Sequence, residues 1–125
     1  DRTIDGHDIR PLIFEDADIK TPYEVFYYYQ EQQLQAVRSG KWKLFLPVEN
    51  YSRHPHFTEG EESEPLLFDV VNDISSSVNV AGQHWDVVKQ LLELAEKAKE
   101  DLGDTGIQGK NVRPAGYVVS PTPRR

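Results

Sequence analysis

An arginine and two histidines lie within four residues of one another, in the run Arg53-His54-Pro55-His56. A guanidinium donates parallel hydrogen bonds to sulfate or carboxylate oxygens, and a protonated imidazole adds a further donor. The run falls in a long polar stretch, residues 48–64, which we expect to be a loop, and loops often carry recognition residues. We take Arg53, His54 and His56 as candidate anion-binding residues. The competing interpretation is a solvent-exposed loop without such a role.

The sequence contains no carboxylates at the spacing of a known cation site. Four carboxylates lie near the N-terminus, but their spacing fits no known calcium loop, so turn and capping roles are expected for Asp5, Asp8, Asp16 and Asp18. The chain has no Cys, which excludes disulfides and thiolate ligands. We therefore predict no metal or cofactor site within these residues.

Length and charge exclude several classes of protein. With 125 residues and 38% hydrophobic content, the chain can form one domain with a modest core. No apolar run is long enough to span a membrane. The net charge of −7 argues against a general nucleic-acid binder, because no dominant basic face exists to displace counterions from phosphates. Neither nucleic acid nor a membrane is expected as a partner.

Four segments have the composition of strands. Residues 24–29 are aromatic and β-branched, residues 34–38 and 41–46 alternate in part, and residues 65–70 follow the polar stretch. Ser39-Gly40 provides a tight turn between the second and third segments. The aromatic side chains Tyr27, Tyr28, Tyr29 and Trp42 could stack on a sugar, but they fit better as the apolar faces of a sheet.

Residues 86–102 carry the clearest helical pattern. Apolar residues recur there at intervals of three and four, and Gly103 is suited to end the helix; they are Val88, Leu91, Leu92, Ala95, Ala98 and Leu102. Residues 1–21 are expected to be extended with one short turn, and the chain after the helix to be Gly/Pro-rich coil. This order predicts an α+β fold, a four-stranded antiparallel sheet with a C-terminal helix packed on one face.

The run from Leu67 to Ala81 reads Leu-Phe-Asp-Val-Val-Asn-Asp-Ile-Ser-Ser-Ser-Val-Asn-Val-Ala. It resembles a signature near the C-terminus of arylsulfatase-type sulfatases, in the alkaline-phosphatase-like superfamily: Leu-Tyr-Asp-Leu-x-x-Asp-Pro-x-Glu-x-x-Asn-Leu-Ala. Two positions depart from it, because Ile74 stands where Pro is usual and Ser76 where Glu is usual. Both fall in the turn after the fourth predicted strand, whose geometry they place in question.

Three further segments resemble the same family in the same order along the chain. Residues 4–13 are similar to Asp-Gly-x-Asp-Leu-x-Pro-Leu-Leu, and residues 26–44 to an aromatic-Tyr-Tyr segment followed by Ala-Val-Arg-x-Gly-x-Tyr/Trp-Lys-Leu. Residues 111–116 look like a tail of bacterial arylsulfatases. With four segments in register, the chain resembles the C-terminal subdomain of a sulfatase. The resemblance implies a linker from the catalytic domain over residues 1–22, the α+β subdomain over 23–109 and a C-terminal tail over 110–125.

The chemistry of that family would lie outside this chain. Sulfatases use a formylglycine made within Cys/Ser-x-Pro-x-Arg; Ser120-Pro121-Thr122-Pro123-Arg124 is close to this pattern, but Thr122 occupies the required Pro position. No catalytic residue is therefore expected here, and the chain alone should be inactive. The resemblance implies that the parent enzyme needs the formylglycine and a divalent cation, calcium.

The same resemblance implies the partners. They are an N-terminal sulfatase catalytic domain in the same polypeptide and a sulfated small molecule or sugar, with Arg53, His54 and His56 at the substrate rim. Exposed apolar surface should face that domain, around Ile9, Leu12, Ile13 and Phe14 and on the sheet face opposite the helix. A periplasmic or secreted location is favoured. The alternative is a non-enzymatic carbohydrate-binding or interaction module.

Overall fold

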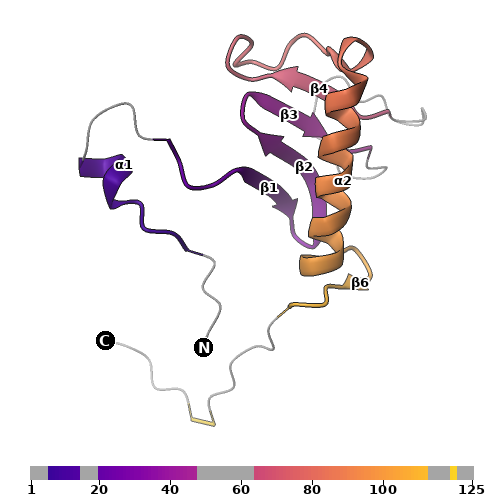
Figure 1. Cartoon of the computed structure of the whole chain (residues 1–125). Coiled ribbons are helices and arrows are strands. Elements are labelled where there is room, and N and C mark those ends of the chain that lie inside the picture. Colours follow the sequence, from indigo (N-terminus) through magenta and orange to yellow (C-terminus); the bar gives the residue numbers. More distant parts are fainter. Residues whose placement is uncertain (1–5, 15–19, 48–63, 113–118, 121–125) are drawn as a thin grey trace.

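A four-stranded antiparallel sheet, covered on one face by a long helix, forms the body of the protein (Figure 1). The structure is a computed structural model that describes residues 6–14, 20–47, 64–112 and 119–120. The strands lie in the order β1-β2-β3-β4, and their bounds and those of the helix are β1 Val25–Gln30, β2 Gln33–Ser39, β3 Trp42–Phe45, β4 Leu66–Asp69 and α2 Trp85–Leu102. The predicted α+β fold is confirmed.

Short turns set the register of the sheet. Glu31 and Gly40 each have a φ of 54°, which closes the β1–β2 and β2–β3 connections in two residues. A bulge interrupts the first pair, because Tyr28 lies opposite Ala36 whereas Tyr29 lies opposite Leu34. The skipped residue is Gln35, and its carbonyl accepts a hydrogen bond from the Leu46 backbone N–H at 2.9 Å.

The register divides the side chains between two faces. Val37, Leu44 and Leu67 lie opposite one another on adjacent strands, and all three are fully buried in the core cluster beneath α2. Successive residues of a strand point to opposite faces, so Ala36, Phe45 and Leu66 lie on the other side of the sheet. We call the side under α2 the inner face and the other side the outer face.

Helix α2 covers the inner face with a narrow stripe of mostly small side chains. Its buried residues are Val88, Leu91, Ala95 and Ala98, whereas Leu92 is half-buried at the margin of the stripe. Small side chains allow the helix to lie close to the strands. Gly103 ends the helix at a φ of 99° and donates its N–H to the Lys99 carbonyl, as the sequence predicted. Among the residues that the structure describes, no helix is long and apolar enough to cross a membrane.

The prediction of coil after α2 was wrong. Strands β5 (Gly103–Asp104) and β6 (Ile107–Gln108) form a small hairpin, with Gly106 at a φ of 73° in its turn. The Tyr29 hydroxyl lies 3.0 Å from the Gly103 carbonyl and 3.4 Å from that of Ala98, and it donates to these oxygens. A contact with β1, 74 residues away in sequence, therefore positions a hairpin too short for a sequence pattern to reveal.

The N-terminal segment also differs from its prediction of extended chain with one short turn. It contains a five-residue helix, α1 (Arg10–Phe14). The Asp8 carboxylate accepts the Arg10 backbone N–H at 3.0 Å and pairs with its guanidinium at 2.6 Å, which stabilises the first turn. Pro11 is compatible with that turn because an N–H there would have no partner within the helix. A 3-10 turn, η1 (Ala81–Gln83), likewise precedes α2 without having been predicted.

The packing of α2 predicts the effect of shortening its largest buried side chain. Leu91 is 3% exposed, so Leu91→Ala should lower the free energy of unfolding by roughly 2–5 kcal/mol, from lost burial and the cavity that remains. Urea denaturation monitored by circular dichroism measures this difference. Leu102→Ala is the matched control, because Leu102 ends the same helix at 49% exposure, and it should cost about 1 kcal/mol or less. Equal losses would show that the stripe is not the core.

Candidate functional site

The anion-binding candidates Arg53, His54 and His56 lie outside the residues that the structure describes, so their role stays a prediction. The strands on either side of that stretch are described. Strand β3 ends at Phe45 and its antiparallel neighbour β4 begins at Leu66, which lies directly opposite Phe45. The intervening chain therefore leaves and re-enters the sheet at one end, next to the Phe45–Leu66 pair.

The family-like run from Leu67 to Ala81 begins with the last three residues of β4 and continues as the connection toward α2, and we call the whole run the signature loop. Its first carboxylate, Asp69, accepts the Lys41 ammonium at 2.7 Å and the side-chain amide of Asn72 at 2.9 Å. It also accepts the backbone N–H groups of Val71 and Asn72 at 3.2 Å. The hydrogen bond from Lys41, followed by that from Asn72, holds the pKa of Asp69 well below its usual range.

The second carboxylate of the signature loop closes the next turn. Asp73 accepts the backbone N–H groups of Ser77 and Val78 at 2.7 and 2.8 Å, and the hydroxyls of Ser75 and Ser77 at 3.0 and 2.9 Å. The Val78 bond is the largest cause that lowers the pKa of Asp73. The turn closes with Ser76 at a φ of 52° and Ile74 exposed, so the two departures from the family signature are accommodated.

Asn79 lies near the end of the signature loop and contacts the edge of β4 that does not pair with β3. Its side-chain oxygen accepts the Leu67 backbone N–H at 3.1 Å and the Ala81 backbone N–H at 3.0 Å. The Val80 N–H also donates to the Leu67 carbonyl at 2.9 Å. These bonds pair an edge strand that would otherwise expose free backbone groups. The polar side chains of the signature loop thus stabilise the backbone, and they leave little capacity for a ligand.

The outer face of the sheet carries an unusual pair of cations. Arg38 and Lys43 lie directly opposite each other on β2 and β3. The Lys43 ammonium lies 4.4 Å from the centre of the Tyr28 ring and 4.6 Å from that of Phe45. Burial, and then the Arg38 charge, lower the pKa of Lys43. We call these four side chains the cation–aromatic cluster. Counting back from the turn at Gly40 could have placed both cations on one face, but the sequence analysis did not do so.

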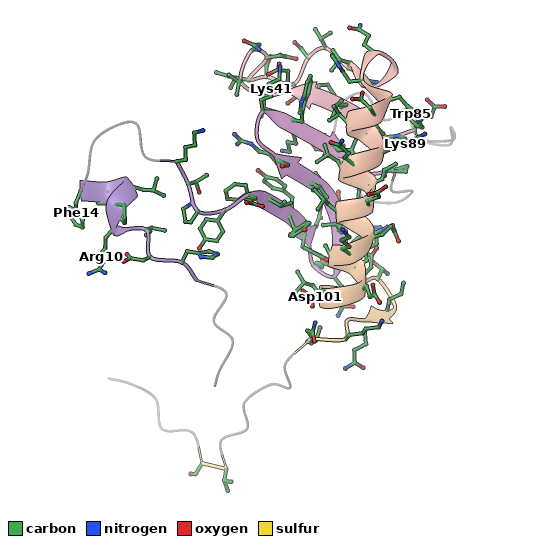
Figure 2. The ribbon with its side chains drawn as sticks, in the orientation of Figure 1. Arg10, Phe14, Lys41, Trp85, Lys89 and Asp101 are labelled. Carbon is green, nitrogen blue, oxygen red and sulfur yellow. The ribbon has the colours of Figure 1, made fainter. Side chains whose placement is uncertain are left out.

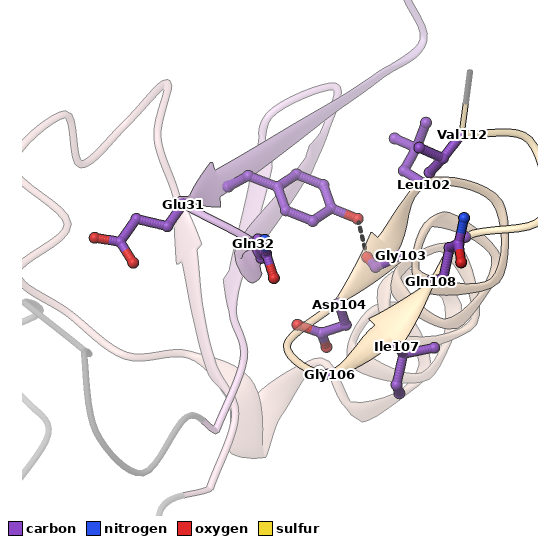
Figure 3. A pocket seen from close by; sticks show the side chains of 11 residues that line it. Glu31, Gln32, Leu102, Gly103, Asp104, Gly106, Ile107, Gln108 and Val112 are labelled. Carbon is purple, nitrogen blue, oxygen red and sulfur yellow. Dashed lines mark hydrogen bonds between the residues drawn. The ribbon is translucent and has the colours of Figure 1, made fainter. Parts of the chain in front are cut away.

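A pocket of about 540 Å³ opens between the end of β1 and the β5–β6 hairpin (Figure 3). Its apolar wall includes Tyr29, Leu102 and Ile107, and its polar rim includes Glu31 and Asp104. Asp104 already accepts the backbone N–H groups of Leu34 and Thr105. Two carboxylates at the rim make the pocket unfavourable for a sulfate group. No pattern in the sequence indicated this pocket, because it depends on the β5–β6 hairpin.

Of the carboxylates considered for a cation site, Asp5, Asp16 and Asp18 lie outside the residues that the structure describes. The described candidates have structural partners. Asp8 pairs with Arg10, the His7 ring contacts Tyr23 edge-on at 4.8 Å, and the His84 ring lies 4.8 Å from that of Trp42. In the described part of the chain, no three His, Asp or Glu residues are grouped so that they could hold a metal ion. Of the aromatics considered for sugar stacking, Tyr29 and Trp42 pack against the core.

The N-terminal segment exposes apolar side chains, as the sequence predicted. Ile9, Leu12, Ile13 and Phe14 all lie at the surface, and Phe14, at the end of α1, is 80% exposed (Figure 2). Tyr23 connects the segment to the sheet, since its hydroxyl accepts the His7 backbone N–H at 3.2 Å and its ring contacts Phe26 at 5.7 Å. This is the kind of surface that a further domain would cover.

The sheet, the covering helix and the signature loop define a small α+β subdomain. The chain belongs to the family described as the C-terminal region of aryl-sulfatase, whose model matches residues 21–115. This confirms the resemblance inferred from the sequence.

Comparison with solved structures shows a similarity to a sulfatase of Bacteroides thetaiotaomicron. The description of that structure concerns the metabolism of multiple glycosaminoglycans by this organism, which a versatile core genetic locus orchestrates. The two share 32% identity with a TM-score of 0.49, and the alignment covers 62% of this chain and 16% of that one. The chain thus spans only a small part of that sulfatase. No curated protein matches the chain.

Asn79 predicts a stability effect that depends on one oxygen atom. Asn79→Ala should lower the free energy of unfolding by about 1–3 kcal/mol, because the buried Leu67 N–H loses its acceptor. Asn79→Asp keeps a side-chain oxygen acceptor and should recover much of the loss. Both values come from urea denaturation at neutral pH. A full loss in the Asp variant would show that the amide nitrogen, and not the oxygen, is needed.

Asp69 predicts a pH dependence with a defined sign. Its folded pKa lies below the ordinary value of 3.8, so its contribution to stability is complete above that pH and disappears as the pH falls through the folded pKa. Asp69→Asn should therefore lower the melting temperature at neutral pH, and the difference from the parent should shrink below about pH 4. Thermal melts across this range measure it. The exposed Glu93→Gln is the control, and a pH-independent difference for Asp69→Asn would contradict the ion pair.

Proposed function

We propose that this chain completes a sulfatase as its C-terminal subdomain and supplies part of the rim of the substrate cleft. The observation that carries the proposal is the family match over residues 21–115, together with a signature loop whose polar groups stabilise the backbone. Membership implies an N-terminal catalytic domain in the same polypeptide. The reaction would be hydrolysis of a sulfate ester, and this chain would be inactive alone.

The stretch between β3 and β4 is the best candidate for the rim. It leaves and re-enters the sheet at one end, and it carries Arg53, His54 and His56. A guanidinium and protonated imidazoles would bind a carboxylate or a second sulfate on the substrate, away from the ester that is cleaved. Binding energy of this kind assists a reaction centre on another domain if it orients the substrate there.

The reactive groups would belong to the catalytic domain. We propose that the parent enzyme uses a formylglycine and calcium there, and that it acts in the periplasm or outside the cell. The exposed N-terminal segment with Ile9, Ile13 and Phe14 would lie against that domain, because burial of these side chains would favour association.

The proposal predicts a selective loss of activity in the full-length enzyme. Arg53→Ala combined with His54→Ala should lower kcat/KM for a sulfated sugar by roughly tenfold or more, since about 1.4 kcal/mol of binding corresponds to a factor of ten. Activity toward a small aryl sulfate should stay nearly unchanged, because that substrate does not reach the rim. Steady-state kinetics on both substrates measure the contrast.

Lys89→Ala is a control for this experiment, because Lys89 is exposed on α2, and neither activity should change (Figure 2). Equal kinetics for the double variant and the parent would remove residues 48–63 from substrate recognition. Turnover of an aryl sulfate by the purified 125-residue chain would contradict its expected inactivity. Binding of a sulfated sugar by a full-length protein that cleaves no sulfate ester would favour the alternative of a carbohydrate-binding module.

A further inference from the structure

Among the residues that the structure describes, no acidic side chain pairs with the two cations of the cation–aromatic cluster. Like charges directly opposite each other on neighbouring strands destabilise a sheet, and Arg38 and Lys43 occupy such a position. Other cations of this protein have acidic partners, among them Lys41 with Asp69 and Lys99 with Glu96. In the described ranges of the chain, neither Arg38 nor Lys43 forms a salt bridge. The Arg38 guanidinium instead donates to the Gly40 carbonyl at 3.2 Å.

The setting of these cations is apolar. The row across the outer face runs Phe26, Arg38, Lys43 and Phe68, and the next row runs Tyr28, Ala36, Phe45 and Leu66. Ring faces attract the Lys43 ammonium, but they do not neutralise its charge. Both cations are half-buried in a chain whose net charge is −7. An anion placed between these two partly desolvated cations would therefore be bound favourably.

We propose that the exposed part of the outer face, around Phe26 and Tyr28, docks against the N-terminal catalytic domain, and that a carboxylate of that domain is seated between Arg38 and Lys43. Ala36, Leu66 and Phe68 on the same face are already buried within this chain and are not part of the proposed contact. This inference rests on the proposed function, because it takes the catalytic domain as the partner. Charge complementarity identifies the anion, and a single carboxylate can accept hydrogen bonds from both cations. Exposed aromatic side chains beside an arginine are also characteristic of interface centres, and Phe26 and Tyr28 remain 40% and 38% exposed.

The proposal predicts that removing the charge of Lys43 affects the melting temperature of the 125-residue chain differently from that of the full-length enzyme. In the 125-residue chain, Lys43 and Arg38 repel each other, so Lys43→Met should leave the melting temperature unchanged or raise it. In the full-length enzyme the same substitution removes one partner of the interdomain carboxylate, and the melting temperature should fall by roughly 3 °C or more. Lys89→Met makes the same chemical change at an exposed position of α2, and it should change the melting temperature of neither protein.

Lys43→Glu provides a second variant with a larger contrast. In the chain alone it places a carboxylate opposite Arg38, which should raise the melting temperature. In the full-length enzyme it places a carboxylate against the proposed interdomain carboxylate, and the loss should exceed that of Lys43→Met. Differential scanning calorimetry at low salt measures the melting temperatures of the three variants in both proteins, each relative to its parent. High salt should reduce the differences in melting temperature between the Lys43 variants and the parents.

Three results would overturn the proposal. An unchanged melting temperature in full-length Lys43→Met would show that no interdomain carboxylate is present. An equal loss in both proteins would place the partner of Lys43 inside this chain. A raised KM for a sulfated sugar with an unchanged melting temperature would make the substrate the anion. These readouts are independent of the proposed function, which fails separately if the full-length parent cleaves no sulfate ester.

Discussion

The close packing of α2 on the inner face of the sheet is the interaction on which the other features depend. A four-stranded sheet of short strands cannot form a core by itself, so Val37, Leu44 and Leu67 need a cover. The helix provides it with Ala95 and Ala98, whose small side chains bring its backbone close to β2. The end of α2 is thereby held beside Tyr29, where the β5–β6 hairpin and the pocket form.

The signature loop gives that helix a fixed starting point. A chain that leaves the edge strand β4 at Asp69 must cross to the inner face before α2 begins at Trp85. Asp69, Asp73 and Asn79 satisfy the backbone along this path, and Asn79 also covers the exposed edge of β4. The residues that identify the family therefore mainly stabilise the backbone of the connection between β4 and α2. Their side chains accept hydrogen bonds from the backbone N–H groups of Leu67, Asn72 and Val78.

The two faces of the sheet have different physical characters. The inner face is closed by α2, which packs on it through the buried apolar side chains of the core cluster. The outer face carries the cation–aromatic cluster, and the first strand there keeps Phe26 and Tyr28 partly exposed. The expected exposure of this face is only partly confirmed, because Ala36, Leu66 and Phe68 on the outer face are buried within the chain.

The sequence alone determined the elements whose pattern is local and repeated. The three- to four-residue spacing from Val88 to Ala98 predicted the helix and most of its buried stripe, and alternation with the Gly40 turn predicted the meander of strands. Four family-like segments in order were enough to identify the family. The boundaries of the four strands of the sheet and of α2 differed from the prediction by one residue at most, because the ends of strands depend on pairing across the sheet.

Tertiary structure decided what depends on contacts distant in sequence. The β5–β6 hairpin has two residues per strand, too few for a period, and it is held by a hydroxyl from β1. The helix at Arg10–Phe14 is a different case, because the carboxylate that caps its first turn is only two residues from Arg10 and the signal was therefore local. The cation–aromatic cluster exists only because pairing brings Arg38 opposite Lys43 and the pleat then places Tyr28 beside them. A linear pattern gives the direction of each side chain, but only the register decides which charges and rings meet.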